Sequence, residues 1–375
     1  MEQFPRGRAA IVGAATYGMG ESPGMRPLDL AAQAAVLALQ DAGLGLDAVD
    51  ALFVCTPDDA LSGLSAAEYL GIAPRFTENN RTGGSAFHSH VITASLMLDA
   101  GYCDVALIIY GSNQRTASGG LVSMRLPSPY EKPYKPLTPL SSYALAASRH
   151  MHEYGTTREH LAEVAVAARS WARLNPEAFA RDELTIEDCL KARMVSDPLS
   201  VRDCCLVTDG AAAVVLTRAD RARDLQAQPI HVLGAAAATW YSGVDQSADL
   251  TVTAARESGP ACLCHCRCRS AGYRCGTALR CLHHQHHSVP RGSRLLPQGR
   301  GRTFRVRRQH RSWRFAAGQY QWRWPVLLPP WHVRIVHPGR VLPATGADRP
   351  ATVRFPVHAW PWHMPTAAPC PARRP

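Results

Sequence analysis

The first 256 residues predict an α/β fold in which helices cover a layer of strands. Short apolar segments of strand type alternate with longer segments whose apolar residues recur at helical spacing. The run DVALIIY (104–110) is continuously apolar and bounded by turn residues, which is typical of a strand buried on both faces. Because strands separated by helices run in the same direction, the pattern favours a mainly parallel sheet.

The predicted elements follow one another along the chain. Strands are expected at 9–15, 49–55, 104–110, 211–216 and 230–236. Helices are expected at 28–42, 64–70, 87–100, 142–154, 158–174 and 186–192. Gly43, Gly71 and Gly101 follow three of these helices, and glycine is the usual residue just after a helix C-terminus. Between 113 and 141 the pattern gives way to Pro, Ser, Gly and Tyr, which predicts a loop insertion that forms a lid or a substrate wall.

The composition changes abruptly near Pro260. Up to that residue the chain has 21 Lys and Arg against 29 Asp and Glu, whereas the rest has 20 Arg, no Lys and a single acid, Asp348. The formal net charge of +11 is therefore the sum of two unlike parts. We divide the chain into an intact N-terminal domain, 1–256, and a tail rich in Arg, Cys, His and Trp, 257–375, which we expect to be unstructured.

The first part has the character of a cytoplasmic protein. It contains no stretch of 18 uncharged apolar residues and no apolar signal-peptide region at its start, so we expect no membrane span. Its five cysteines (Cys55, Cys103, Cys189, Cys204 and Cys205) show neither a disulfide framework nor CxxC spacing. We expect them to be reduced and mostly structural.

Four blocks of the first part carry a family resemblance. They are AAIVGAATYGMG (9–20), GYCDVALIIYGSNQR (101–115), SRHMHEYGTTREHLAEVAVAAR (148–169) and DPLSVRDCCLVTDGAAAVVLT (197–217). Together they resemble the thiolase superfamily, in particular its sterol-carrier-linked and lipid-transfer-type members, often labelled acetyl-CoA acetyltransferases. The resemblance covers residues 8–256. It implies a layered α-β-α fold of two similar halves with the active site between them, a coenzyme A thioester as substrate, no tightly bound cofactor, and a homodimer or tetramer.

The resemblance also locates the turn that carries the thiolase nucleophile. In thiolases a cysteine at a strand-to-helix turn attacks the acyl-CoA carbonyl, and the helix N-terminus stabilises its thiolate. The matching turn here is ENNRTGGSAF (78–87), and the family pattern places the nucleophile at Arg81. No cysteine lies between Cys55 and Cys103.

Other residues of this turn are candidates for a role at the site. Ser85 is a substitute nucleophile with His88 or His90 as its base, although the favoured interpretation is that Ser85 only begins a helix. The two histidines are two residues apart and so point to different helix faces. Gly83 and Gly84 lack side chains and are the better candidates for close approach of the backbone to a substrate.

The missing cysteine argues against thiolysis more than against catalysis. Some relatives that resemble this chain are retro-aldolases that cleave steroid side-chain CoA thioesters and depend on a small zinc-ribbon and OB-fold partner protein. That chemistry needs a base for a hydroxyl proton and donors for a thioester enolate, but no covalent acyl-enzyme.

In its own reading frame the tail resembles no thiolase. Translated in the next reading frame, it does resemble this family. With synonymous third bases chosen freely, a one-base shift converts 278–287 to LYDAFTINT, which resembles a block of this family. The same shift permits AFAIAGVGPPDIDVVQ from 261–278 and NGGGLSYCHPGMYGLFILVE from 321–340, the latter with the expected Cys-His-Pro loop. We infer a frameshift at about 258–262 that scrambles the second, catalytic half.

The tail has two other interpretations. Cys262, Cys264, Cys266 and Cys268 alternate around His265, which is poor spacing for a structural zinc site, so we expect no metal. The tail also mixes arginines with aromatic residues as nucleic-acid-binding segments do (Arg305, Arg307, Arg308, Arg311, Arg314, Trp313, Trp322, Trp324 and Trp331). Arginine without lysine is equally what GC-rich DNA gives out of frame, so we expect no specific nucleic acid.

The sequence therefore predicts a thiolase-like acyl-CoA enzyme of lipid or sterol metabolism, impaired in this translated form. Its reaction is either acyl transfer or retro-aldol cleavage of a carbon–carbon bond. The alternatives are a non-catalytic thiolase-like subunit of a complex and a nucleic-acid-binding protein that acts through its basic tail.

Overall fold

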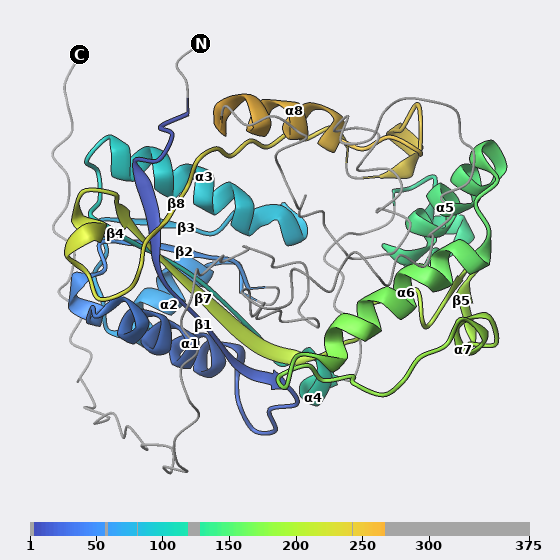
Figure 1. Ribbon diagram of the computed structural model, residues 1–375, viewed down its shortest axis with the longest axis horizontal. Coiled ribbons are helices and arrows are strands. Elements are labelled where there is room, and N and C mark those ends of the chain that lie inside the picture. Colours follow the sequence, from blue (N-terminus) through green and yellow to red (C-terminus); the bar gives the residue numbers. More distant parts are fainter. Residues whose placement is uncertain (1–3, 57–58, 81, 119–127, 242, 267–375) are drawn as a thin grey trace, which may run out of the picture. The chain divides into compact units, whose positions relative to one another are not determined.

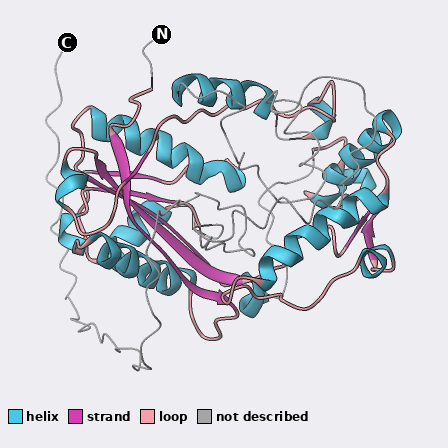
Figure 2. Ribbon diagram, viewed as in Figure 1, coloured by secondary structure: helices cyan, strands magenta, loops and turns pink. Residues whose placement is uncertain are grey.

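The computed structural model describes residues 4–56, 59–80, 82–118, 128–241 and 243–266. Its central feature is a six-stranded sheet with the strand order β3-β2-β4-β7-β1-β8 (Figures 1 and 2). These strands are β1 (Ala9–Gly20), β2 (Ala51–Val54), β3 (Phe76–Glu78), β4 (Val105–Ser112), β7 (Asp209–Arg218) and β8 (Ile230–His231). A separate two-stranded sheet pairs β5 (Met194–Ser196) with β6 (Leu199–Ser200).

Eight α-helices occur in the described ranges. They are α1 (Pro27–Ala42), α2 (Ser62–Leu70), α3 (Ala86–Asp99), α4 (Gln114–Ser118), α5 (Leu140–Tyr154), α6 (Arg158–Arg173), α7 (Ile186–Leu190) and α8 (Ala255–Cys266). Gly43 ends α1 and Gly71 ends α2, as the sequence predicted, and both adopt the left-handed conformation. None of these helices combines the length and apolarity that a bilayer crossing requires.

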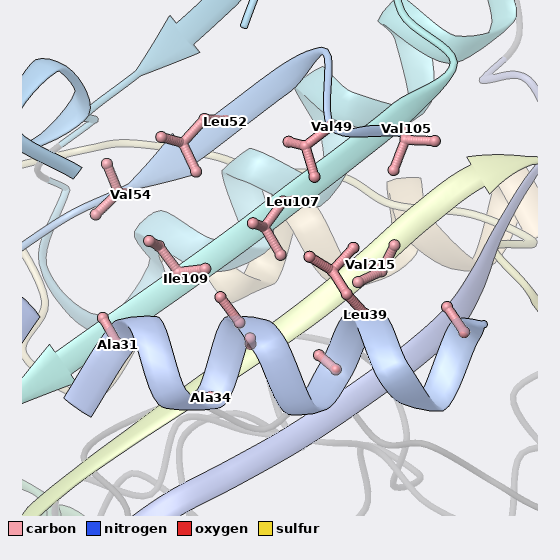
Figure 3. Close-up of a cluster of buried hydrophobic side chains, with 14 of the residues drawn as sticks. Ala31, Ala34, Leu39, Val49, Leu52, Val54, Val105, Leu107, Ile109 and Val215 are labelled. Atoms are coloured by element: carbon pink, nitrogen blue, oxygen red, sulfur yellow. The ribbon is translucent and has the colours of Figure 1, made fainter. Parts of the chain in front are cut away.

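One face of the sheet packs against α1 and α2. Every second residue of the central strand β4 points to this face, where Leu107 and Ile109 meet the alanine-rich side of α1 (Figure 3). Small residues allow the helix to lie close to the sheet. At Gly13 and at Gly111 an added Cβ would lie 2.1 and 2.0 Å from a backbone carbonyl oxygen of α1.

The opposite face packs against α3. Ala106, Ile108 and Tyr110 of β4 point to this side, together with Phe53 of β2. All eight residues of β4 are buried, which confirms the prediction of a strand covered on both faces. The sheet is thus the middle of three layers, with α1 on one side and α3 on the other (Figure 1).

The prediction of a mainly parallel sheet is wrong for the hydrogen-bonded pairs. Strand β2 pairs in parallel with β3 and β4, but β7 pairs antiparallel with both β4 and β1, and β8 pairs antiparallel with β1. Strands β1 to β4 do share one direction. Strand β7 enters the sheet between β4 and β1 after the long segment 113–208 and runs in the opposite direction. Hydrophobic periodicity carries no information on strand direction, so the sequence pattern could not predict this reversal.

Two predicted boundaries fall within helices of the structure. The insertion at 113–141 includes the helix α4, and α5 already begins at Leu140. The domain boundary at 256 lies within α8, which continues to Cys266 because Cys262 and His265 contact the carbonyls of Gly234 and Ala235. The expectation for 267–375, including the nucleic-acid and shifted-frame interpretations, lies outside the described residues.

Candidate functional site

The candidate site is the turn between β3 and α3. Strand β3 pairs with β2, so the turn begins at the carboxyl ends of two parallel strands, where α/β proteins commonly place their sites. The Asn79 side-chain amide donates to the carbonyl of Ala60 at 2.6 Å, and the backbone N–H of Thr82 donates to Asn80 Oδ1 at 3.1 Å. The sequence pattern did not single out either asparagine, although polar residues directly after a strand are the signal. Arg81, in the nucleophile position, lies outside the described residues.

The glycines and Ser85 form the first turn before α3. Gly83 has a φ of +76°, a conformation that favours glycine, and Gly83–Ser85 form a single 3-10 turn. The Ser85 hydroxyl donates to the carbonyl of Thr82 at 3.1 Å, and α3 begins at the next residue, Ala86. The structure therefore gives Ser85 the helix-start position that sequence analysis favoured, with its hydroxyl proton engaged by the main chain.

His88 and His90 lie on different faces of α3. His88 is exposed, whereas His90 is fully buried between the rings of Phe53 and Phe87. Among the described residues, neither ring nitrogen of His90 has a hydrogen-bond partner. Burial lowers the pKa of His90 to about 4, so the imidazole is neutral at physiological pH. His90 belongs to the core, whereas His88 is the exposed histidine of this helix.

Three of the described cysteines are poorly suited to form a thiolate. Burial raises the pKa of the Cys103 thiol to about 12, and that of the Cys204 thiol to about 11. It also raises the pKa of the Cys189 thiol. A thiol nucleophile requires the opposite shift.

The part of the tail that the structure describes does not gather metal ligands. Cys262 and Cys266 point toward the body of the domain, whereas Cys264 is exposed. Within the described ranges, no three His, Cys, Asp or Glu side chains lie close enough together to hold a metal ion.

The arrangement can stabilise negative charge. The first turn of a helix directs backbone N–H groups toward its N-terminus, and at α3 this turn follows a glycine pair that has little bulk of its own. Such a turn suits a developing oxyanion or a thioester enolate.

Comparison with solved structures identifies the architecture. The chain superposes on "Ltp2-ChsH2(DUF35) aldolase" with a TM-score of 0.69 and 27% identity, covering 79% of this chain and 78% of that one. It also matches a monomeric SCP2-thiolase-like protein type 1 from Mycobacterium smegmatis with a TM-score of 0.65, over 78% of this chain and 65% of that one; at 20% identity this match concerns the fold alone. The described chain has a thiolase-like fold.

Sequence comparison agrees with this thiolase-like fold. The chain is 36% identical to the "17-hydroxy-3-oxo-4-pregnene-20-carboxyl-CoA lyase" of Mycobacterium tuberculosis over 61% of its own length and 62% of the relative's. It is 33% identical to the "Steroid side-chain-cleaving aldolase" of Thermomonospora curvata over 63% of each chain, and 30% identical to an "Acetyl-CoA acetyltransferase" of Methanothermobacter thermautotrophicus over 64% and 65%. The chain thus spans a little under two thirds of the length of these curated relatives. No family model matches it.

Proposed function

We propose that this chain belongs to an enzyme that cleaves a carbon–carbon bond of an acyl-CoA thioester by a retro-aldol reaction, without a covalent acyl-enzyme. The observation that carries the proposal is the candidate turn itself. It retains the helix N-terminus and the glycine pair, but no cysteine lies between Cys55 and Cys103. The similarity to a CoA lyase and to a steroid side-chain-cleaving aldolase supports this choice over acyl transfer.

The residues of the turn have distinct proposed roles. A base removes the proton of a β-hydroxyl group, the bond between the α and β carbons breaks, and its electron pair forms a thioester enolate, which is then protonated. The products are a carbonyl compound and a shortened acyl-CoA. We assign the exposed imidazole of His88 as the candidate base, and the backbone N–H groups of Gly83 and Gly84 as donors to the enolate oxygen. Ser85 and Arg81 have no proposed chemical step.

The reaction also needs the second half of the fold. We propose that this half is encoded beyond about codon 258 in the next reading frame, because the shifted frame permits a Cys-His-Pro loop at 321–340. The chain as translated is then impaired. A non-catalytic thiolase-like subunit is the remaining alternative for it.

A partner protein and a cytoplasmic location complete the proposal. The neighbouring structure named for Ltp2 and ChsH2 supports a complex, and we propose either a homodimer or a zinc-ribbon and OB-fold partner. The bound substrate is a CoA thioester, and no tightly held cofactor is required by the retro-aldol route.

The test compares two proteins and two reactions. The chain as translated and a frame-corrected version are each incubated with a steroid CoA thioester that carries a β-hydroxyl group, and separately with a 3-ketoacyl-CoA plus free CoA. The frame-corrected protein is expected to release a ketone from the first substrate and to leave the second intact. Cleavage that requires free CoA, together with a covalent acyl adduct in the intact mass, would establish thiolysis instead.

A variant of the candidate base tests the assignment within the turn. His88→Gln in the frame-corrected protein is expected to lower kcat for ketone release by about 10²-fold or more, because general-base catalysis contributes at least this much. Ser89→Ala, one residue along the same helix, is the matched control and is expected to retain activity. Equal rates for His88→Gln and the unmodified protein would remove His88 from the mechanism.

A further inference from the structure

A buried carboxylate lies where β7 begins. Asp209 is 1% exposed and accepts four hydrogen bonds. Its Oδ2 accepts from the backbone N–H of Ser22 at 2.8 Å and from the hydroxyl of Thr116 at 2.7 Å. Its Oδ1 accepts from the backbone N–H groups of Arg115 and Thr116 at 2.9 and 3.2 Å. Hydrogen bonds to an ionised acceptor are about twice as strong as neutral ones, and burial makes the loss of any of them costly.

These donors come from two separate places in the chain. Ser22 lies between β1 and α1, whereas Arg115 and Thr116 lie in the first turn of α4, directly after β4. The chain leaves the sheet at the end of β4, runs through the segment 113–208, and returns at Asp209. The Asp209 carboxylate therefore connects the start of this segment with its end. It also accepts hydrogen bonds from first-turn N–H groups of α4 that have no partner within the helix.

The side chain of Arg115 adds a second connection at the same place. Its Nε pairs with Glu21 Oε1 at 2.6 Å, its Nη1 donates to the carbonyl of Val207 at 3.3 Å, and its guanidinium lies 4.8 Å from the centre of the Phe179 ring. Gly20 has a φ of +106°, and an added Cβ there would lie 2.7 Å from Phe179. The chain between α6 and α7 is thus held against the end of β1.

We infer that Asp209 is a positioning residue that fixes the segment 113–208 on the central sheet. When the carboxylate is lost, the first turn of α4 and the backbone at Ser22 lose their acceptor, and the segment is released while the sheet keeps its own pairing. Asp209 acts on the attachment of this segment to the sheet. This role does not depend on the proposed reaction, because its test needs no activity.

Hydrogen exchange tests this inference on the full chain. Thr116→Val removes one donor to Asp209 and keeps the side-chain shape, whereas Thr116→Ser keeps the donor. We expect Thr116→Val to raise exchange about tenfold in peptides that cover α4 to α6, with unchanged exchange in β2 and β4, and we expect Thr116→Ser to restore slow exchange. Asp209→Asn, which places an amide against these donors, is expected to have a larger effect in the same peptides.

A second carboxylate of the same sheet provides the control. Asp50 accepts hydrogen bonds from the backbone N–H groups of Asp104 and Val105 at 2.9–3.1 Å, entirely within the sheet region. Asp50→Asn is expected to raise exchange near β4 and not in α4 to α6. The inference is overturned if Thr116→Val and Thr116→Ser exchange alike, or if Thr116→Val accelerates exchange equally in β2 and in α5.

Discussion

At the scale of single residues, the start of α3 shows how neighbouring polar side chains acquire different roles. The Ser85 hydroxyl donates to the main chain, His88 is exposed, and His90 is fully buried between two phenylalanine rings. Helical geometry separates the two histidines because residues two apart point in different directions. The pKa of the buried His90 is moved far from the ordinary value, and burial is the cause.

His90 makes the domain sensitive to acid. Burial lowers its folded-state pKa to about 4, against 6.5 for an ordinary histidine, so between these values the unfolded chain binds a proton that the folded chain does not. Stability therefore falls as the pH falls through this range, by about 2 kcal/mol between pH 7 and pH 5 from this residue. His90→Leu is expected to remove that part of the difference in the free energy of unfolding, measured in urea at the two pH values.

A neighbouring variant separates titration from packing. Phe53→Leu alters the contact with the imidazole but removes no titratable group, so it should lower stability equally at both pH values. If His90→Leu kept the full pH difference of the unmodified chain, the acid sensitivity would have another origin.

At the scale of secondary-structure elements, the close approach of α1 to the sheet defines the core. The helix presents buried alanines to β1, β4 and β7, and glycines on the strands receive its backbone. Interiors packed this closely resist added volume, so a single methyl group has a large effect where it meets a backbone atom.

Gly111→Ala tests this contact directly. The new Cβ would lie 2.0 Å from the carbonyl oxygen of Pro27 and 3.0 Å from the nitrogen of Ala31, so α1 must shift. We expect the free energy of unfolding to fall by about 2 kcal/mol or more in urea titrations. Gly101→Ala is the matched control, since its φ of +73° gives strain of about 1 kcal/mol but nothing lies within 4 Å. Equal losses for the two variants would contradict the packing argument.

Elements with a strong periodic pattern were predictable from the sequence, whereas their directions and long-range contacts were not. The continuous apolar run that forms β4 and the glycine that ends α1 both lie where the pattern placed them. The short strand β3 has only three residues and no apolar run, so it gave no signal. At the candidate site, helical spacing was enough to separate His88 from His90. The contacts of Asp209, at the start of β7, were not predictable, because its hydrogen-bond partners lie 93 to 187 positions away in the sequence and leave no local pattern.

At the scale of the whole molecule, two compositions meet near Pro260. The first part carries the blocks that resemble thiolases and adopts the thiolase-like fold, while almost all of the arginine excess follows it. The resemblance to thiolases implies a second half that covers surfaces of the first and completes the site. A scrambled second half would leave those surfaces open.

We therefore expect the chain as translated to associate through exposed apolar surface. In size-exclusion chromatography with light scattering, it should elute as polydisperse aggregates, whereas the frame-corrected protein should form a discrete oligomer. A monodisperse chain that unfolds cooperatively at the same temperature as the frame-corrected protein would show that the first part needs no second half.

Resequencing of the coding DNA across codons 250–290 decides whether the thiolase-like half is followed by a second half that is encoded in the next frame. We expect one inserted or deleted base near codons 258–262, after which the thiolase-like blocks are read in order. A confirmed reading frame with no such base would rule out the frameshift and make the arginine-rich tail a genuine part of the protein.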